Sequence, residues 1–502
     1  MMRAQTSPAR LMPDARTDTR ATLFFALGLI ALYIGVMAAK FALWRANVLM
    51  SDWAFYNNSF WNTDFQHYWL FSHDRIVLFG YPSYLNEHFG PLLLVIAALY
   101  HWVPYPEAML LLLHGAAPVL AAIFIYATAV HLIGDRPLAA TIAMTYALTP
   151  GILWPTISLV YGFEPDGMLA PLAAAVAWAL ATRRTGVYFT ALVLALAIKE
   201  NVPAYGLILG ACLFLFTDRR RQALATMAIS FVVFLIASKG VPAITGVENR
   251  NVGRVWTFID NVVHLRPTFD YTLAQIVIGL GYSVVFLPAL YVWPYLAMLG
   301  PDLLLIGQVS YANTVTWHVM LPVTMLGSAA VFGTTRILKT DAWPATLDRR
   351  MPRLKQVRLY WTAMLIVSLI AGPATIWLGY SRYIALRSPV DPAAAAQAMA
   401  LVPADAGVIV TSDLEQYFVR HRVISSRPDV VAQAGGDFSY FAVNRFSLNP
   451  GRVNGPLAAV AHQDACFIAA AERLAGQGGA KVMDAGGILV VRFDKLPKLN
   501  CG

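Results

Sequence analysis

The sequence has little charge. Asp, Glu, Lys and Arg make up 13% of its 502 residues, whereas soluble domains usually contain about 25% charged residues. Hydrophobic residues make up 58%, and the mean hydropathy is +0.57. These values exclude an ordinary soluble domain and indicate an integral membrane protein with many spans. The formal net charge is +9, but Arg and Lys in membrane proteins mark cytoplasmic loops, so we do not interpret this balance as nucleic-acid binding.

Cysteine is also scarce. The chain has three cysteines and no Cys-x-x-Cys pair, so the sequence contains no cysteine-based metal or redox motif. Cys466 and Cys501 both lie in the C-terminal region. Outside the cytoplasm two such cysteines can form a disulfide, and here a disulfide and two free thiols both stay open.

The first 20 residues contain four arginines and no apolar run, and a long apolar stretch follows over residues 21–44. This stretch is too long for the core of a signal peptide, and no small-residue cleavage site follows it. We therefore expect a cytoplasmic N-terminal tail over residues 1–21 and a retained first span.

Apolar segments then alternate with basic and with neutral loops, which predicts an α-helical polytopic membrane protein of about 11 spans within residues 22–380. Nine spans are expected at about 22–45, 106–132, 137–154, 167–182, 223–239, 273–289, 291–307, 318–336 and 359–379. Between the basic segments 182–186 and 217–221 we expect two short helices that meet at residues 197–203, since one span would leave the basic ends on opposite sides. A polar and aromatic outer loop is expected over 46–105, with a short interfacial helix near its end, and a second outer loop over 240–272.

From residue 385 onward the composition changes to that of a small α/β domain, which we place on the extracytoplasmic side over residues 385–502. Within residues 403–428 we expect a first strand near 408–410, then a polar helix and a second short strand. Further strands are expected within 437–446 and 488–493, and a longer helix over 462–479. The predicted location is the inner (cytoplasmic) membrane of a bacterium.

An acid, Asp52, stands just past the first apolar helix. It is either a solvated helix-end acid or a functional carboxylate. The residues that follow mix aromatic rings with asparagines, a combination that suits the apolar face and the hydroxyl rim of a sugar but also occurs in interfacial belts. The candidate sugar contacts are Trp53, Tyr56, Asn57, Trp61 and Asn62.

Lys199, Glu200 and Asn201 fall at the expected tip of the two short helices. Charges inside a membrane are costly and usually functional. The Lys199 ammonium needs an anion, which is either the neighbouring Glu200 or the phosphate of a lipid. Arg250 and Arg254 in the second outer loop either complete a phosphate clamp or are solvated.

Further ionisable residues are expected to line an outer cavity. They are Glu87, His88, Glu164, Asp166 and His318. The carboxylates can serve as general base and as ligands of a divalent cation, or they can pair with Lys199 or Arg254 as structural ions. His318 is either a ligand or an ordinary helix-end histidine. No cofactor is certain, and a divalent cation is possible.

Several short motifs occur in a fixed order along the chain. After Asp52 come the segments FWN (60–62), EHFGP (87–91), YGFEPDG (161–167), AIKENVP (197–203), PDLLL (301–305) and TWH (316–318). In this order the sequence resembles, over residues 45–330, a bacterial and archaeal family of multi-span membrane proteins of unknown function. That family is similar to the C-type glycosyltransferase superfamily, which includes protein O-mannosyltransferases and aminoarabinose transferases acting on lipid A.

The resemblance implies a polyprenyl-phosphate sugar donor, an outer active site and an acid at the position of Asp52 as general base. The sequence departs from the family in three motifs. It has Lys-Glu-Asn at Lys199 where the family has Lys-Glu-Asp, and Phe-Glu-Pro-Asp at residues 163–166 where the family usually has Phe-His-Pro-Glu. The family motif His-Tyr-x-Tyr is reduced to Trp-His-Val at residues 317–319, which puts a donor-binding or metal-binding part of the missing histidine in doubt.

The sequence thus predicts a membrane glycosyltransferase that moves a sugar, with inversion, from a polyprenyl-phosphate lipid to an unidentified extracytoplasmic acceptor. Asp52 is the expected base, and Lys199, Arg250 and Arg254 are the expected phosphate ligands. Two alternatives stay open: a lipid or solute transporter that uses Lys199 and Glu200 as a coupled charge pair, and a non-catalytic envelope assembly or sensor protein.

Overall fold

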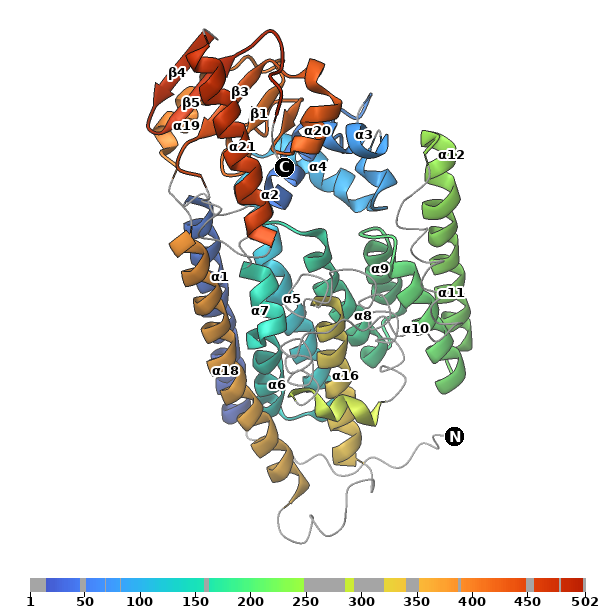
Figure 1. Cartoon of the computed structure of the whole chain (residues 1–502). Helices are drawn as coiled ribbons and strands as arrows, with labels where there is room; N and C mark the ends of the chain where they lie inside the picture. Colours follow the sequence, from blue (N-terminus) through green and yellow to red (C-terminus); the bar gives the residue numbers. More distant parts are fainter. Residues whose placement is uncertain are drawn as a thin grey trace.

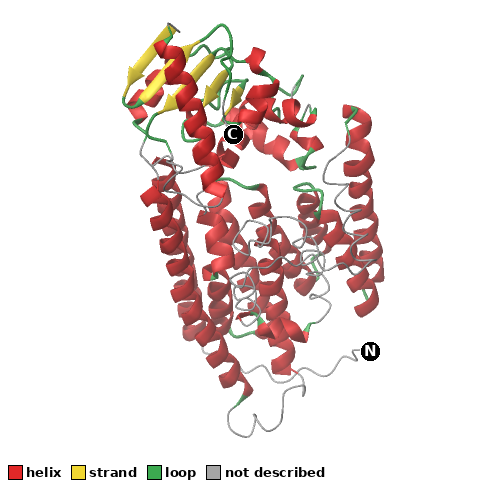
Figure 2. Cartoon of the chain, viewed as in Figure 1, coloured by secondary structure: helices red, strands yellow, loops and turns green. Residues whose placement is uncertain are grey.

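The computed structural model of the chain describes residues 15–45, 51–67, 69–81, 83–157, 162–247, 285–292, 320–339, 352–386, 390–447, 456–477 and 480–499. Most of this part of the chain is helical, and a small sheet domain lies near the C-terminus (Figures 1 and 2). The predicted class, a helical membrane protein with a small C-terminal α/β domain, is confirmed. The predicted spans 273–289 and 291–307 lie mostly outside the described residues.

Five helices in the described part of the chain are long and apolar enough to cross a membrane. They are α1 (Ala15–Arg45), α5 (Pro106–Ile133), the run formed by α11 (Arg220–Leu235), η3 (Ile236–Gly240) and α12 (Val241–Thr245), α16 (Met320–Lys339) and α18 (Arg353–Leu386). Each coincides with a predicted span. The total of about 11 spans stays a prediction, because the described residues do not cover every predicted span.

A further predicted span is a bent pair of helices, α6 (Arg136–Leu148) and α7 (Pro150–Ile157), whose axes differ by 47°. Thr149 between them has an extended backbone, with ψ 135°. The residue before a proline is disfavoured in helical conformation, so Pro150 explains why the helix breaks here.

Two short helices follow α8 (Leu169–Thr182), as the sequence predicts. They are α9 (Thr185–Leu196) and α10 (Val202–Phe216), and the turn between them carries Lys199. α10 packs on α11 through Gly206 and Gly210, which lie one turn apart. A Cβ on Gly210 would clash with Met227 of α11 and reach the carbonyl oxygen of Ala223 at 3.0 Å. Small residues at this spacing allow close contact between membrane helices.

We predict that Gly210→Ile destabilises the protein by forcing α10 and α11 apart, at a cost of about 1–3 kcal/mol. Thermal unfolding in detergent should show a lower midpoint than in the wild type. The matched control is Gly186→Ile in α9, because a Cβ on Gly186 meets nothing within 4 Å. Equal midpoints for the two variants would contradict the packing argument.

The segment after α1, which the sequence suggests is a loop, contains further helices. They are α2 (Ser51–Trp61), α3 (His73–Phe79), the short 3-10 helix η1 (Tyr84–Asn86) and α4 (Leu92–Trp102), the last being the predicted interfacial helix. α2 has no Gly or Pro, and Asp52 in its first turn complements the helix dipole. Its buried residues Trp53, Tyr56 and Phe60 recur at helical spacing, so burial of one face stabilises a helix despite the polar composition.

The C-terminal domain combines a mixed sheet with helices. Its elements include α19 (Pro392–Leu401), β1 (Val408–Val410), η6 (Glu415–Tyr417), β2 (Ile424–Ser425), α20 (Pro428–Gln433), β3 (Tyr440–Asn444), α21 (Pro456–Gly476), β4 (Ala480–Ala485) and β5 (Ile488–Arg492). The strand order is β2-β1-β3-β5-β4, with β2, β1 and β3 parallel and the other two pairings antiparallel. The predicted strands and the long helix are present, whereas β4 and α19 are not predicted from the sequence. Cys466 in α21 is disulfide-bonded, and Cys501 lies outside the described residues.

The sheet domain lies at one end of the helix bundle, beside α2, α3 and α4 (Figure 1). The side-chain amide of Asn58 in α2 donates hydrogen bonds to the carbonyl oxygens of Val419 and His421, both at 2.8 Å. The helices α2 and α3 therefore form a layer between the bundle and the α/β domain.

Candidate functional site

Asp52 lies in the first turn of α2 and is partly buried. Within the described part of the chain its carboxylate accepts no hydrogen bond. Burial raises its pKa to about 6, and the nearby charge of Arg75 opposes this rise more than any other group does. Asp52 therefore changes its protonation state close to neutral pH, as a proton acceptor in catalysis should.

Arg75 in α3 is held in place by two contacts. Its Nε and Nη1 atoms lie 3.0 and 3.1 Å from the carboxylate oxygens of Glu87, just after η1. Its guanidinium also lies over the ring of Phe55, at 5.0 Å from the centroid. Phe55 follows Asp52 by three residues in α2, so the two side chains share a helix face. No motif in the sequence pointed to Arg75.

Lys199 and Glu200, in the turn between α9 and α10, have separate partners. Lys199 Nζ lies 2.7 Å from Oδ2 of Asp166, and Glu200 accepts hydrogen bonds from the backbone N–H of Phe89 at 3.1 Å and contacts Nδ1 of His88 at 2.9 Å. The direct partner of Lys199 is therefore Asp166, one of the carboxylates that the sequence offered as a structural ion, while Glu200 acts on Lys199 only through its nearby charge. Adjacent residues in a tight turn point in different directions, whereas Asp166, 33 residues earlier, reaches Lys199 directly.

Glu164 precedes the 3-10 helix η2 (Pro165–Met168) and is only 5% exposed. The hydroxyl of Tyr56 donates a long hydrogen bond to it at 3.4 Å and also bonds the hydroxyl of Tyr84 at 2.8 Å. Burial and then the charge of Asp166 raise the pKa of Glu164 well above its usual value. Burial therefore favours the protonated form of Glu164 over the ionised form.

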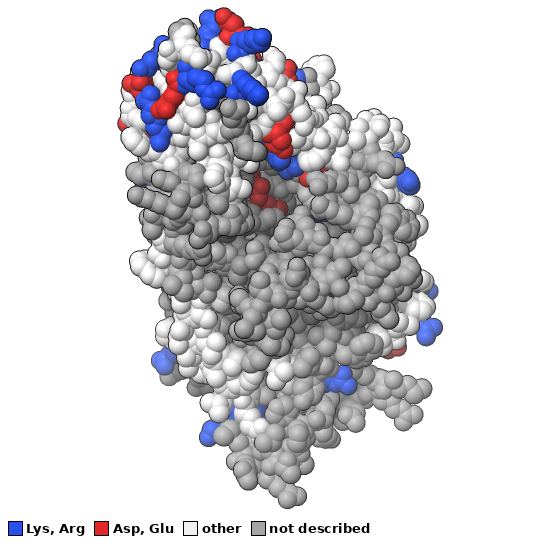
Figure 3. Space-filling model, in the orientation of Figure 1, with Lys and Arg blue, Asp and Glu red and all other residues white. Residues whose placement is uncertain are grey.

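The cluster has more acids than permanent cations. Its carboxyl groups are Asp52, Glu87, Glu164, Asp166 and Glu200, and its permanent cations are Arg75 and Lys199. Acidic and basic side chains lie together in a hollow below the sheet domain (Figure 3). Among the described residues no group of three His, Cys, Asp or Glu side chains is arranged to hold a metal ion.

The predicted sugar contacts on α2 are mostly buried in the structure. Trp53, Tyr56 and Asn57 are at most 4% exposed. The Asn57 amide donates to the carbonyl of Trp53 and accepts from Tyr100. Trp61 lies at the far end of α2, where Arg420 covers its ring.

The remaining predicted residues are placed as follows. Asn62 bonds the backbone of α2, and the buried amide oxygen of Asn201 has no hydrogen-bond partner among the described residues. Arg250, Arg254 and His318 lie outside the described residues.

A buried cation, Lys40 in α1, was not predicted. It is 1% exposed, and its ammonium contacts His114 Nδ1 at 2.9 Å and donates to the carbonyls of Thr156 at 2.8 Å and Gly162 at 2.7 Å. It thereby links α1 and α5 to the segment that carries Glu164. A single lysine near the end of an apolar helix gives no distinctive pattern in the sequence, because such residues often reach the interface.

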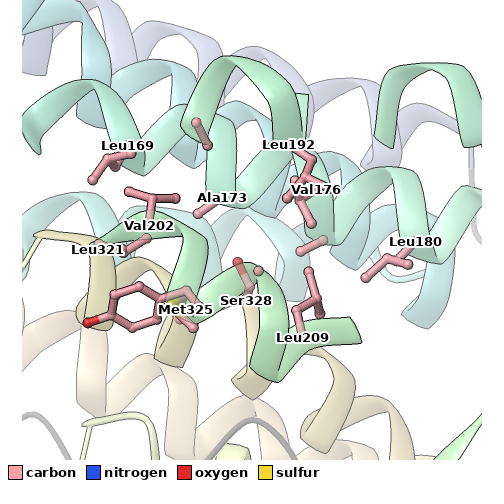
Figure 4. Close-up of a pocket in the computed structure, with 14 residues that line it drawn as sticks. Leu169, Ala173, Val176, Leu180, Leu192, Val202, Leu209, Leu321, Met325 and Ser328 are labelled. Atoms are coloured by element: carbon pink, nitrogen blue, oxygen red, sulfur yellow. The ribbon is translucent and has the colours of Figure 1, made fainter. Parts of the chain in front are cut away.

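An apolar cavity lies between α8, α9, α10 and α16 (Figure 4). Its lining includes Leu169 and Val202, which follow Asp166 and Lys199 by three residues each, while the ion pair itself does not line the cavity. The hydroxyls of Tyr205 and Ser328 line it without a hydrogen-bond partner in the described part of the chain. The cavity is small, with a volume of about 70 Å³, and its lining is almost wholly apolar.

We predict that Lys199→Met destabilises the protein by about 3–5 kcal/mol, because it leaves the Asp166 carboxylate buried without its cation. The double variant Lys199→Met/Asp166→Asn should recover most of this loss, since both charges are gone. Thermal unfolding in detergent measures both effects. A double variant as unstable as the single one would show that the pair is not the cause.

Comparison with known proteins gives one family and several similar structures, including two of ArnT. The family described as "Predicted membrane protein (DUF2079)" matches residues 51–428. No curated protein matches the chain. A structure of ArnT from Cupriavidus metallidurans bound to undecaprenyl phosphate is 13% identical, with 94% of this chain and 99% of that chain covered and a TM-score of 0.46. The same protein in the apo state is 13% identical, with 93% and 98% covered and a TM-score of 0.48. Because both TM-scores are below 0.5, we transfer no residue assignment from these structures.

Proposed function

The chain belongs to the DUF2079 family of predicted membrane proteins, and from this premise we propose that it is a membrane glycosyltransferase. Its donor would be a sugar linked to a polyprenyl phosphate. The observation that carries the proposal is the placement of Asp52, with no hydrogen bond from the described residues, in a charged cluster that also holds the buried Lys199–Asp166 pair, with an apolar cavity in the neighbouring helices α8, α9, α10 and α16. Such a site offers a proton acceptor and a place for a lipid in one region.

The reaction follows from these groups. A hydroxyl of the acceptor attacks the anomeric carbon of the sugar while Asp52 takes the hydroxyl proton. The bond between the anomeric carbon and the phosphate oxygen breaks, and the polyprenyl phosphate leaves with the bonding electrons. Attack from the side opposite the phosphate inverts the configuration. Asp52 then returns its proton to solvent.

The pKa shifts of Asp52 and Glu164 are consistent with different roles for the two carboxyl groups. Asp52, with its pKa raised to about 6, is mostly ionised at pH 7 and accepts a proton. The pKa of Glu164 is raised well above its usual value, so burial favours its protonated form, and its carboxyl oxygen accepts the long hydrogen bond from Tyr56. Two carboxyl groups in one cluster with different protonation states are a common feature of acid–base active sites.

The phosphate needs positive charge to offset the acids of the cluster. Lys199 is a described cation of the cluster, and Arg250 and Arg254 stay candidates on the grounds of sequence. Cations stabilise a leaving phosphate because its negative charge grows in the transition state. Since Asp166 already pairs with Lys199, a divalent cation that arrives with the phosphate is a second source of charge, and binding with and without Mg²⁺ distinguishes the two.

The transporter alternative relied on Lys199 and Glu200 acting as one charge pair. In the structure they have different partners, Asp166 and His88. This favours the transferase over the transporter, and no described feature favours a sensor.

We predict that undecaprenyl phosphate binds the purified protein in nanodiscs, with its chain in the apolar cavity. Ala173→Trp should fill the cavity and weaken binding at least tenfold, whereas Leu224→Trp, at a position 53% exposed on the outside of α11, should not. Lys199→Met/Asp166→Asn should also weaken binding, because the cation is gone while the buried charge stays balanced. If wild type and both tryptophan variants bind equally well, the cavity is not the lipid site.

We predict that transfer depends on ionised Asp52. The rate of release of undecaprenyl phosphate from a sugar-loaded lipid, tested over a panel of sugars, should fall as the pH drops through about 6. Asp52→Asn should bind the lipid normally and lose about 10²–10⁴-fold in rate. The control is Asp135→Asn, which removes an acid that pairs with Arg358 away from this site. An unchanged rate in Asp52→Asn would exclude Asp52 as the base.

A further inference from the structure

The helix α3 connects the segment after the first span with the C-terminal domain. Along the chain it lies in the segment between the first span and α4, but its residues Val77 and Leu78 pack against the apolar core of the C-terminal domain. That core includes Phe441 of β3 and Phe467 of α21. The side chains of one short helix therefore complete the core of a domain more than 300 residues further along the sequence.

Polar contacts fix the same helix to the same domain. Ser425 of β2 donates a hydrogen bond to Asp74 Oδ2 at 3.2 Å. His73 Nε2 lies 3.0 Å from Oδ2 of Asp437. Apolar packing and two polar contacts together determine both the position and the rotation of α3, because each contact restrains a different residue of the helix.

The other face of α3 carries Arg75. Asp74, Val77 and Leu78 lie three and four residues apart and form the stripe that meets the C-terminal domain. Arg75 and Phe79, also four residues apart, form the neighbouring stripe, and the guanidinium lies 5.8 Å from the Phe79 ring. From this stripe Arg75 reaches Glu87 and the ring of Phe55, beside Asp52.

We infer that the C-terminal domain, through α3, positions the Arg75 guanidinium against Glu87 and Phe55, on the side of α2 that carries Asp52, and that Arg75 is a positioning residue for that carboxylate. The inference rests on the proposed function of Asp52 as the base. The domain would then be part of the active site without contacting the reacting atoms. Its core fixes α3, α3 fixes the guanidinium, and the positive charge stabilises the carboxylate that accepts the proton.

Several other groups surround Asp52 and must be kept constant in any test. They are Tyr56, Glu87, His88, Glu164, Lys199 and Glu415. Of the charges that act on Asp52, Arg75 has the largest effect, and it lowers the pKa of that carboxyl. Loss of the guanidinium should therefore raise the pH at which Asp52 ionises, by about one unit or more for a close opposite charge.

The test measures the protonation of Asp52 directly in the full-length protein in nanodiscs. A hydrophobic carbodiimide modifies protonated carboxyl groups, and mass spectrometry of peptides reports the modified fraction at Asp52 as a function of pH. The variants are Arg75→Gln, Arg75→Lys, Leu78→Ser, Ser425→Ala and the double variant Arg75→Gln/Leu78→Ser. The matched control is Val482→Ser, which removes an apolar side chain from the other core of the same domain.

We expect the midpoint of Asp52 modification to move to higher pH in Arg75→Gln and to stay near the wild-type value in Arg75→Lys and Val482→Ser. Leu78→Ser should shift it in the same direction as Arg75→Gln, and the double variant should shift it no further. Ser425→Ala, which removes one hydrogen bond, should give a smaller shift of the same sign if Leu78→Ser proves too unstable to measure.

Two results would overturn the inference. A wild-type midpoint in Arg75→Gln would show that the guanidinium does not act on Asp52. Additive shifts in the double variant would show that the C-terminal domain affects Asp52 by a route other than Arg75. Because the modification needs neither lipid nor turnover, a shift without any transferase activity would leave the coupling intact and refute only the proposed function.

Discussion

The structure depends on the pairing of charges that have been removed from water. An ammonium or a carboxylate buried without a partner costs several kcal/mol, so each such group must meet an opposite charge or a set of hydrogen bonds. Lys199 meets Asp166, Glu200 meets His88, and Arg75 meets Glu87. These contacts connect segments that lie far apart along the chain, and together they hold the α9–α10 turn, η2 and the α3–η1 region around one cluster.

Two acids of the cluster, Asp52 and Glu164, are left out of this pairing, and the pKa values of both are raised. Asp52 accepts no hydrogen bond from the described residues, and Glu164 receives only the long one from Tyr56. Burial raises the pKa of both, to about 6 for Asp52 and further for Glu164. Groups that the surrounding structure leaves reactive near neutral pH are typical of functional sites. The paired residues thus support the cluster, and the unpaired acids are its reactive part.

The position of the cluster follows from the layers of the fold. The bundle supplies an apolar cavity, the α2–α3 layer supplies polar groups, and the α/β domain covers that layer from the other side (Figure 1). A lipid with a charged head requires apolar and polar surroundings a short distance apart. Lys40 of α1 helps to position Glu164, because its ammonium donates hydrogen bonds to the carbonyl oxygens of Thr156 and Gly162, and Gly162 precedes Glu164 by two residues.

The sequence alone determined the helical membrane class, five of the long spans, the pair of short helices around Lys199 and the α/β character of the C-terminus, because hydrophobic runs and periodicity are local signals. It also selected most acids of the cluster, since charges are conspicuous in an apolar chain. Only the tertiary structure decided which charges pair. Glu200 is next to Lys199 in sequence, yet the ammonium of Lys199 contacts Asp166. Arg75 and Lys40 had no local pattern, and their positions depend on contacts between distant segments. The same reason explains α2, whose polar sequence becomes helical because the bundle and the C-terminal domain bury it from two sides.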